Sequence, residues 1–193
     1  MSNRMGHLFV VSGPSGVGKT TLIERLLRED KNARFSVSYT TRERRDRETE
    51  GMDYRFVDEA TFKEMIEKGG FIEWEEVHGY LYGTPLNEVL EPLKEGLDVV
   101  LDIDVKGALT VKEKCDQACL IFIEPPSVDE LIKRLSLRGE REIEKRMERV
   151  RQEMERRQFF TYTVRNDTID IAYQTFKSVI MTVREQGNGK NNC

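Results

Sequence analysis

Long apolar runs and an excess of basic charge are both missing from this sequence. The 193-residue chain contains no apolar run near the length of a membrane-spanning helix, which needs about 20 residues. Its first residues lack the apolar run and small-residue cleavage site of a signal peptide. The formal net charge is −4, whereas a domain that coats nucleic acid is normally basic. We therefore expect a cytoplasmic protein with no membrane partner and no nucleic-acid partner.

Cysteine and histidine are too few to form a metal centre. Cys115 and Cys119 could share one helix face and Cys193 ends the chain, while the two histidines, His7 and His78, lie elsewhere. This set completes no metal-ligand pattern, and the cysteine count is odd. We expect reduced, inert thiols and two histidines without a chemical role, with His7 at the surface.

What the sequence does contain is an alternation of strand and helix patterns. The run Leu8–Val11 is short, partly β-branched and followed by Gly13 and Pro14, which predicts a buried parallel strand. From Lys19 onward, apolar residues recur at helical spacing. Further strands are predicted at Val99–Asp104, Cys119–Glu124 and Tyr162–Arg165. The length suits one domain, and the alternation predicts an α/β fold whose parallel sheet is flanked by helices.

A phosphate-binding loop (P-loop) joins the first predicted strand to the first predicted helix. The sequence there matches G-x-x-x-x-G-K-[ST], in the strand-to-helix context that the motif requires. Its glycines let backbone N–H groups converge on an anion, and the helix adds its unpaired amides. We expect Lys19 to reach the β- and γ-phosphates and the Thr20 hydroxyl to ligate Mg²⁺. The expected triphosphate site comprises Gly13, Pro14, Ser15, Gly16, Val17, Gly18, Lys19, Thr20 and Thr21.

Two carboxylates follow the predicted strand Val99–Asp104. Asp102 and Asp104 are two residues apart, so we expect them to share one face of the strand at the carboxyl edge of the sheet. There one carboxylate could hold Mg²⁺ directly or through water while the other is free for the substrate, and we expect Asp102 to be the metal ligand. The alternative is that both residues simply begin a polar loop. Motors, switches and kinases share a P-loop, so these features leave the phosphate acceptor open.

The segment from about residue 36 to residue 84 interrupts the strand–helix alternation and is rich in aromatics and carboxylates. Arg42 and Arg45 could lie together beside an anion, because arginine binds phosphate with a two-pronged fork. A solvated loop of mixed charge is the alternative for this arginine-rich stretch. Arginines with tyrosine hydroxyls suit a monophosphate. Carboxylates with hydroxyls suit a base that offers N–H donors, as guanine does through its N1–H and N2 amino group.

Together these motifs resemble the guanylate kinase family. The resemblance extends from the P-loop almost to the C-terminus and rests on "SGPSGVGKTT", "FSVSYTTR", "FIEWEEVHGYLYGT", "LDIDVKG", "IFIEPPS" and the "RND" of residues 165–167. It implies phosphoryl transfer from Mg-ATP to GMP, giving ADP and GDP. It implies that the phosphate of GMP is bound by Arg42, Arg45, Tyr54 and Tyr82. It also implies guanine contacts from Ser38, Glu73, Thr84 and Asp104, and that Asn166 lies near the adenine of ATP.

The resemblance further implies three parts of the chain. These are a P-loop core of residues 1–35, 85–126 and 158–193, a GMP-binding region of residues 36–84, and a lid of residues 127–157. Phosphoryl transfer needs positive charge over the transferring group. The family pattern assigns this catalytic role to Lys19 together with the lid residues Arg134, Arg138 and Arg146. For the lid arginines, the alternative is a solvated helix with i,i+4 ion pairs.

Other functions remain as alternatives. A catalytically silent guanylate-kinase-like interaction module would typically lose the P-loop lysine or the GMP arginines, and this chain has both. A related P-loop kinase of another phosphorylated acceptor would have no use for Glu73, Thr84 and Asp104. A GTP-driven switch is disfavoured because no N-K-x-D-like motif occurs. The sequence leaves a monomer and a homodimer equally open.

Overall fold

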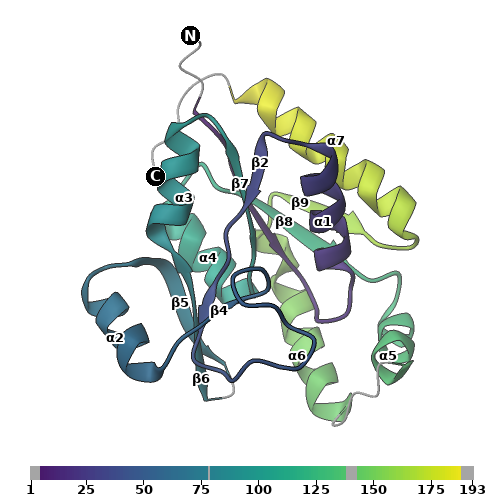
Figure 1. Ribbon diagram of the computed structural model, residues 1–193. Helices are drawn as coiled ribbons and strands as arrows, with labels where there is room; N and C mark the ends of the chain where they lie inside the picture. The colour runs from purple at the N-terminus through teal and green to yellow at the C-terminus, as the bar shows by residue number, and fades with distance from the viewer. Residues whose placement is uncertain (1–4, 78, 138–142, 188–193) are drawn as a thin grey trace.

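Two β-sheets organise the fold (Figure 1). The computed structural model describes residues 5–77, 79–137 and 143–187. Its elements run in the order β1 (Leu8–Ser12), α1 (Lys19–Glu29), β2 (Ala33–Phe35), β3 (Tyr39–Thr40), β4 (Arg55–Phe56), α2 (Glu59–Glu67), β5 (Phe71–Val77), β6 (Tyr80–Pro85) and α3 (Leu86–Lys94). They continue with β7 (Asp98–Asp102), α4 (Val105–Lys114), β8 (Cys119–Glu124), α5 (Val128–Leu137), α6 (Ile143–Glu155), a 3-10 turn (Arg156–Phe159), β9 (Tyr162–Arg165) and α7 (Ile169–Gln186).

The larger sheet has five strands in the order β2-β7-β1-β8-β9, and every pairing is parallel. The predicted α/β fold is therefore confirmed. The central strand β1 is apolar on both faces because helices cover both. Its Phe9 and Val11 pack into one apolar cluster, whereas Leu8 and Val10 pack into another.

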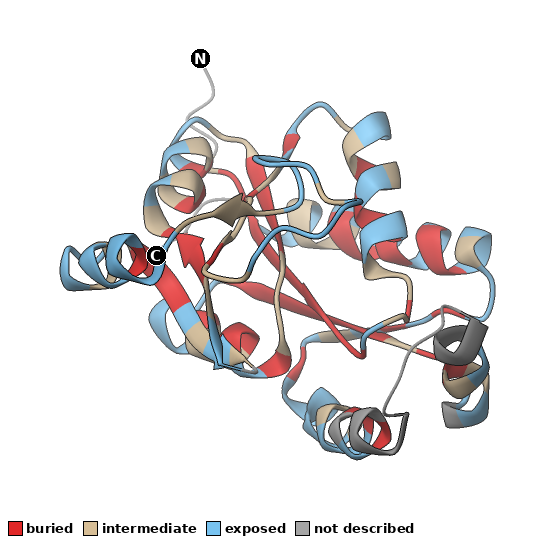
Figure 2. Ribbon diagram, turned by 60° about the horizontal axis from the view of Figure 1, so that its bottom comes forward, coloured by how far each residue is buried: buried red, intermediate tan, exposed pale blue. Residues whose placement is uncertain are grey.

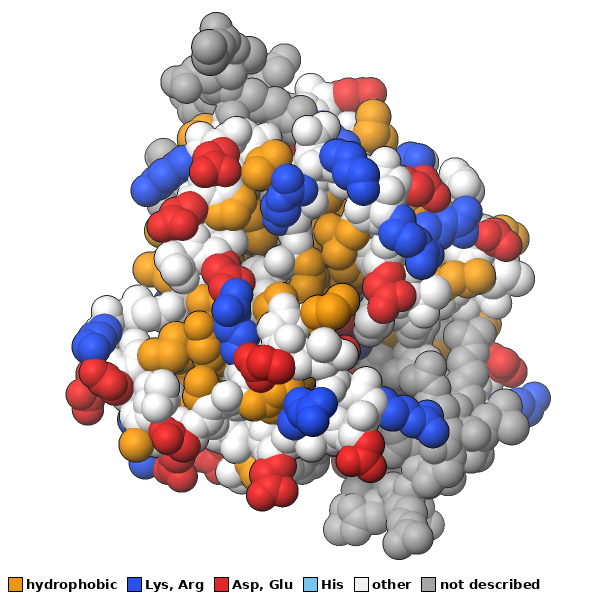
Figure 3. Space-filling model, viewed as in Figure 1, with side chains coloured by type: hydrophobic (Ala, Val, Ile, Leu, Met, Phe, Trp, Pro, Cys, Tyr) orange, Lys and Arg blue, Asp and Glu red, His pale blue; other side chains and the backbone are white. Residues whose placement is uncertain are grey.

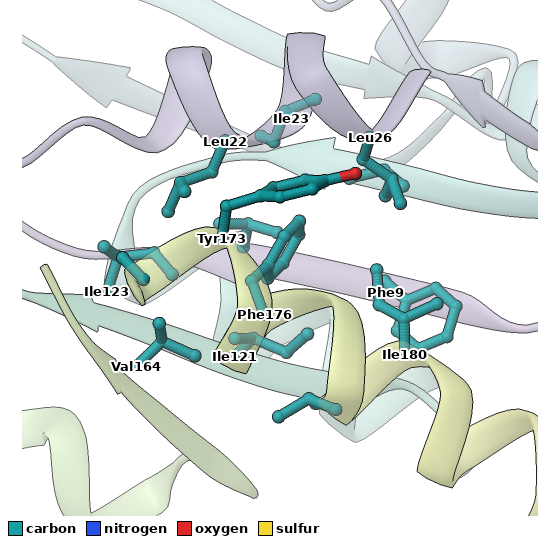
Figure 4. Packing of buried hydrophobic residues seen from close by; sticks show 14 of the residues in the cluster. Phe9, Leu22, Ile23, Leu26, Ile121, Ile123, Val164, Tyr173, Phe176 and Ile180 are labelled. Carbon is teal, nitrogen blue, oxygen red and sulfur yellow. The ribbon is translucent and has the colours of Figure 1, made fainter. Parts of the chain in front are cut away.

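Helices α1 and α7 cover one face of the five-stranded sheet. Figure 4 shows Leu22 and Leu26 of α1 meeting Tyr173 and Phe176 of α7, with Phe9 of β1 beneath them. Helices α3 and α4 contribute Val89, Leu93, Val105, Ala108 and Val111 to the cluster on the opposite face. The strands between these helices are the buried layer of the molecule, as Figure 2 shows. This rigid frame holds the ends of β1 and β7 in fixed register.

The smaller sheet has four strands in the order β4-β3-β6-β5. Strands β5 and β6 form an antiparallel hairpin, and helix α2 packs on the sheet through Phe62, whose ring stacks on Phe71 at 4.5 Å. A Cβ on Gly83 would lie 2.9 Å from Phe62 Cζ and from Phe71 Cδ1, so only glycine fits under these rings. The break in the strand–helix alternation predicts that this segment is separate from the parallel sheet, but strands within it were not expected.

Three expectations from the sequence are wrong. Strand β7 ends at Asp102, and Asp104 is the N-cap of α4, because its carboxylate accepts a hydrogen bond from the Gly107 amide at 2.8 Å. His7 is buried, since its main-chain and ring nitrogens both approach the Asp98 carboxylate. Cys115 is disulfide-bonded, so the expectation of reduced thiols is wrong for this residue, whereas Cys119 is a free, buried cysteine. The spacing of cysteines in a sequence does not show which thiols meet in the fold.

Helices α5 and α6 form the segment for which a lid is expected (Figure 1). Arg134 belongs to α5 and Arg146 to α6, whereas Arg138 lies outside the described residues. Within the described ranges, no helix combines the length and the apolar character needed to cross a membrane. Acidic and basic side chains are interspersed over the face in Figure 3.

Candidate active site

The P-loop lies between β1 and α1, where three glycines take backbone angles that other residues rarely adopt. The φ values are +136° at Gly13, +82° at Gly16 and +102° at Gly18. A Cβ on Gly13 would stand 2.2 Å from the Ile123 carbonyl oxygen, so the loop lies directly against β8. Gly18 is the N-cap of α1 and has no side chain to bind the first-turn amides. These amides are therefore available to an anion.

Lys19 spans the mouth of the loop. Its ammonium donates to the Gly13 carbonyl at 2.7 Å and stands 3.8 Å from Asp102 Oδ1. Asp102 is close because β1 and β7 pair in register there, with Val11 opposite Asp102. Burial raises the pKa of Asp102 above its ordinary value, and the neighbouring Lys19 ammonium and Thr20 hydroxyl act against that rise. The cation is thus held where a triphosphate would enter.

The oxygen atoms of Thr20 and Asp102 suit a hard cation. Thr20 is exposed in the first turn of α1. Its hydroxyl forms a hydrogen bond with the Asp102 carboxylate that favours the ionised form of Asp102. Hydroxyl and carboxylate oxygens beside a phosphate site are the donors that Mg²⁺ prefers. The predicted magnesium pair therefore fits such an ion in both position and chemistry.

Asn166, expected near adenine, braces the P-loop. Its side chain is 5 % exposed, and its Nδ2 donates to the Val17 carbonyl at 2.7 Å. Its main-chain amide donates to the Glu124 carbonyl at the end of β8. A Cβ on Gly18 would stand 2.5 Å from the same Nδ2. The residue therefore joins the ends of β8 and β9 to the loop.

A buried carboxylate–hydroxyl pair lies in the smaller sheet. Glu73 of β5 and Thr84 of β6 are opposite in register, and the Thr84 hydroxyl donates to Glu73 Oε1 at 2.5 Å. Glu73 is 4 % exposed. Burial raises the pKa of Glu73 to about 7 against the hydrogen bonds from Thr84, and the negative charge of Asp104 adds to the rise. A Cβ on Gly107 would be 2.8 Å from Glu73 Oε2 and 3.5 Å from Asp104 Oδ1, so these two carboxylates converge from separate elements.

An arginine and two tyrosines gather farther along the same sheet. Arg42 donates from Nε to the Tyr82 hydroxyl at 3.1 Å, and its guanidinium carbon lies 5.6 Å from the centre of the Tyr54 ring. The rings of Tyr54 and Tyr82 meet edge to face at 5.7 Å. Burial raises the pKa of Tyr54 to about 12, so its hydroxyl stays protonated as a donor. The guanidinium and the two tyrosine hydroxyl groups, all of which can donate to an oxyanion, thus lie in one group.

Two further predicted residues lie at the margins of this group. Ser38 is half-buried before β3, and its carbonyl accepts a hydrogen bond from the Arg55 amide. Arg45 is exposed on the loop after β3. Glu48 was not predicted as a site residue, although its carboxylate binds Arg42 and the Arg45 amide. The one feature of the sequence that could have indicated this contact is an acidic residue a few positions after two arginines.

A cleft of about 380 Å³ separates the hairpin from α6. Asp104 lines it together with Glu75, Lys106, Glu148, Gln152 and Arg156. Glu75 is two residues beyond Glu73, so both project from the same face of β5. Asp104 therefore borders an open space that the lid segment also borders, and Glu73 lies two residues from another lining residue.

A P-loop at the carboxyl edge of a parallel sheet, with a polar cluster from a second sheet near it, defines a P-loop kinase. The family model described as guanylate kinase matches residues 5–183. This chain therefore belongs to the guanylate kinase family.

Individual relatives agree with this assignment. A guanylate kinase of Syntrophomonas wolfei is 47 % identical over 185 residues, which cover 94 % of this chain and 95 % of the relative. One of Caldanaerobacter subterraneus is 44 % identical over 92 % of this chain and 88 % of its own. The crystal structure of guanylate kinase from Anaplasma phagocytophilum superposes with a TM-score of 0.79 at 30 % identity, covering 98 % of this chain and 90 % of that one.

Proposed function

We propose that this protein is a guanylate kinase that transfers the γ-phosphoryl group of ATP to GMP, forming ADP and GDP. The single observation that carries the choice of acceptor is the buried Glu73–Thr84 pair beside Asp104. Glu73 and Thr84 present oxygen acceptors on the smaller sheet, with Asp104 beside them, while Tyr82 of the same sheet and Arg42 of the loop after β3 present donors. A purine nucleotide with N–H groups at one end and a phosphate at the other matches both the acceptor groups and the donor groups.

The donor site binds the triphosphate of ATP. Main-chain N–H groups of the loop between Ser15 and Thr21 surround the β-phosphate, and the Lys19 ammonium exchanges its carbonyl partners for phosphate oxygens. Thr20 and Asp102 would hold Mg²⁺, which would neutralise phosphate charge. Asn166 acts on this site through the loop as well as through its position beside adenine.

The acceptor site distinguishes guanine by hydrogen-bond direction. Ionised Glu73 accepts from the N1–H and N2 amino groups of guanine, and Asp104 accepts at the same edge. Thr84 and Ser38 complete the contacts with the base. Adenine presents an acceptor at N1, so AMP leaves the buried carboxylate unpaired, which costs about 1–3 kcal/mol.

Alignment of the two nucleotides supplies most of the catalysis. Holding two reactants in line lowers a barrier by roughly 7–11 kcal/mol. Lys19 and the lid arginines Arg134, Arg138 and Arg146 stabilise the charge of the transferring group. Closure of residues 36–84 and 127–157 over the core, residues 1–35, 85–126 and 158–193, excludes water as a competing acceptor. Because its substrates are nucleotides of the cytoplasm, we place the activity there.

The test is ADP formation from Mg-ATP with GMP, AMP, UMP, IMP or no acceptor. We expect turnover with GMP far above the other acceptors. A folded protein that binds GMP but turns over no acceptor would instead be an interaction module. Preference for a substrate other than GMP would identify another P-loop kinase.

A further inference from the structure

Glu48 uses both carboxylate oxygens on the two arginines of the acceptor-phosphate group. Its Oε1 accepts from Arg42 NH2 at 2.7 Å, and its Oε2 accepts from the main-chain amide of Arg45 at 2.9 Å. The Arg42 and Glu48 side chains are only 11 % and 15 % exposed. Such a shielded, bidentate carboxylate constrains its partners far more than an exposed ion pair does.

The backbone closes around the same carboxylate. The Glu48 amide donates to the Arg45 carbonyl at 3.0 Å, and Arg44 NH1 donates to the Glu48 carbonyl at 2.8 Å. The loop from Arg42 to Glu48 is therefore a turn with the Glu48 side chain directed back to its beginning. Loss of this carboxylate removes the one side chain that joins the beginning of the turn to its middle.

Arg42 is oriented by three protein acceptors. Besides Glu48, its Nε binds the Tyr82 hydroxyl and its NH1 binds the Glu43 carbonyl. These contacts engage three of the five N–H donors of a guanidinium. The remaining donors, on NH1 and NH2, keep a fixed direction for a ligand. The Phe56 ring, centred 5.8 Å from the guanidinium carbon, adds a further restraint.

We propose that Glu48 is a positioning residue that fixes the Arg42 guanidinium and the Arg45 backbone for the phosphate of the acceptor nucleotide. This inference rests on the proposed function, in which both arginines bind the phosphate of GMP. Positioning of Arg42 by Glu48 and neutralisation of Arg42 by Glu48 predict opposite effects on phosphate binding when Glu48 is removed. If Glu48 chiefly neutralised Arg42, its removal would strengthen phosphate binding, whereas loss of positioning weakens it.

The ionisation of Glu48 fits this role. Burial alone would raise the pKa of Glu48, but the hydrogen bonds from Arg42 and from the Arg45 amide outweigh burial and hold the pKa below its ordinary value. The carboxylate is therefore ionised throughout the neutral range, and both its oxygens remain acceptors. A glutamine at this position has one acceptor oxygen and an NH₂ group that repels one of the two donors.

The test compares Glu48→Gln with Glu43→Gln, a matched loss of one negative charge on the same loop. The Glu43 side chain is exposed, and only its main-chain carbonyl meets Arg42. For E48Q we expect the KM for GMP to rise about tenfold, the size expected for one charged hydrogen-bond pair. The KM for ATP and the affinity for guanosine, which lacks the phosphate, should stay within about twofold of wild type. E43Q should behave as wild type.

Arg42→Lys, alone and combined with E48Q, shows whether Glu48 acts through Arg42. We expect the double variant to lose little more GMP affinity than R42K alone, because the two residues act as a unit. An unchanged or lower KM for GMP in E48Q would overturn the proposal. So would an equal loss of guanosine affinity, which indicates general disruption. Wild-type protein without turnover of GMP would instead reject the proposed function.

Discussion

The P-loop and the acceptor cluster bind their ligands with different parts of the chain. The P-loop offers main-chain amides held in place by glycines, one of which packs directly on β8. The acceptor cluster offers side chains from the short strands and loops of the smaller sheet, paired with one another as Glu73 with Thr84 and Arg42 with Tyr82. We therefore expect the P-loop to be disrupted by substitutions that add atoms, and the acceptor cluster by substitutions that remove atoms or charges.

The largest effect on kcat should come from Lys19, the positively charged side chain of the P-loop. Lys19→Met removes a preorganised cation from the transferring phosphoryl group, and we expect kcat to fall about 10²–10³-fold. The thermal midpoint should move little, because the contacts of Lys19 in the described structure are two loop carbonyls and a long ion pair of 3.8 Å with Asp102. Steady-state kinetics with GMP and a thermal melt check both parts. A fall in kcat below tenfold would contradict the role given to Lys19.

Removing the charge of Glu73 tests the acceptor cluster. Glu73→Gln replaces a buried acceptor by a group with its own N–H donors, and a lost charged hydrogen bond costs about 1.5–3 kcal/mol. We expect kcat/KM for GMP to fall roughly 10- to 150-fold while the KM for ATP is unchanged. Parallel titrations of GMP and ATP measure this. A matching rise in the KM for ATP would mean that the two sites are not separate.

Adding one methyl group tests the P-loop. Gly18→Ala places a Cβ 2.5 Å from the Asn166 amide at a φ of +102°, so we expect a loss of about 1–3 kcal/mol of unfolding free energy and weaker ATP binding. Gly51→Ala is the matched control, because its φ of +72° is also positive but no atom lies within 4 Å of the added Cβ. Urea unfolding of both variants checks this. Equal losses would show that Asn166 does not brace the loop.

The smallest effect concerns pH. The pKa of Glu73 is about 7, and only the ionised form accepts the guanine N–H groups. We expect kcat/KM for GMP to rise up to about tenfold per pH unit below 7 and to level off above it. E73Q should show no such limb. A kcat/KM for GMP that stays constant from pH 5.5 to 8 in the wild type would contradict this role of ionised Glu73.

The same raised pKa has a stability consequence of fixed sign. A carboxyl group whose pKa is higher in the folded state binds its proton more tightly there, so its contribution to stability is complete below the unfolded pKa of 4.5. That contribution is lost as the pH rises toward 7. The difference in unfolding free energy between E73Q and wild type should therefore shift in favour of E73Q over this interval, as urea titrations at several pH values would show.

Much of the larger sheet could be predicted because its signals are local. The run Cys119–Glu124 coincides with β8, since a strand buried on both faces is a nearly continuous apolar run. The prediction of a strand at Tyr162–Arg165 also coincides with β9, although only Val164 of this edge strand is buried. Two-residue strands such as β3 and β4 carry no such signal. The end of β7 could not be predicted either, because Asp104 turns from a strand pattern to a helix cap only in three dimensions.

The two halves of the candidate site differ in the same way. The P-loop spacing lies within eight residues and is set by the anion, so the sequence alone predicts it. Arg42 and Tyr82 lie 40 residues apart and are brought together by strand pairing. Their chemistry suggested a monophosphate site, but only the family resemblance implied that the two residues bind one phosphate. Glu48 belonged to no motif that the analysis used, and its role depends on where the loop folds back.

The most direct test of this comparison is GMP binding in the absence of ATP, measured by calorimetry on wild type, K19M and E73Q. If backbone and side chains build two separate sites, K19M should bind GMP with wild-type affinity, while E73Q should bind it roughly 10- to 150-fold more weakly. A K19M variant whose affinity for GMP falls as much as that of E73Q would contradict the existence of two separate sites, because the acceptor cluster would then depend on the P-loop.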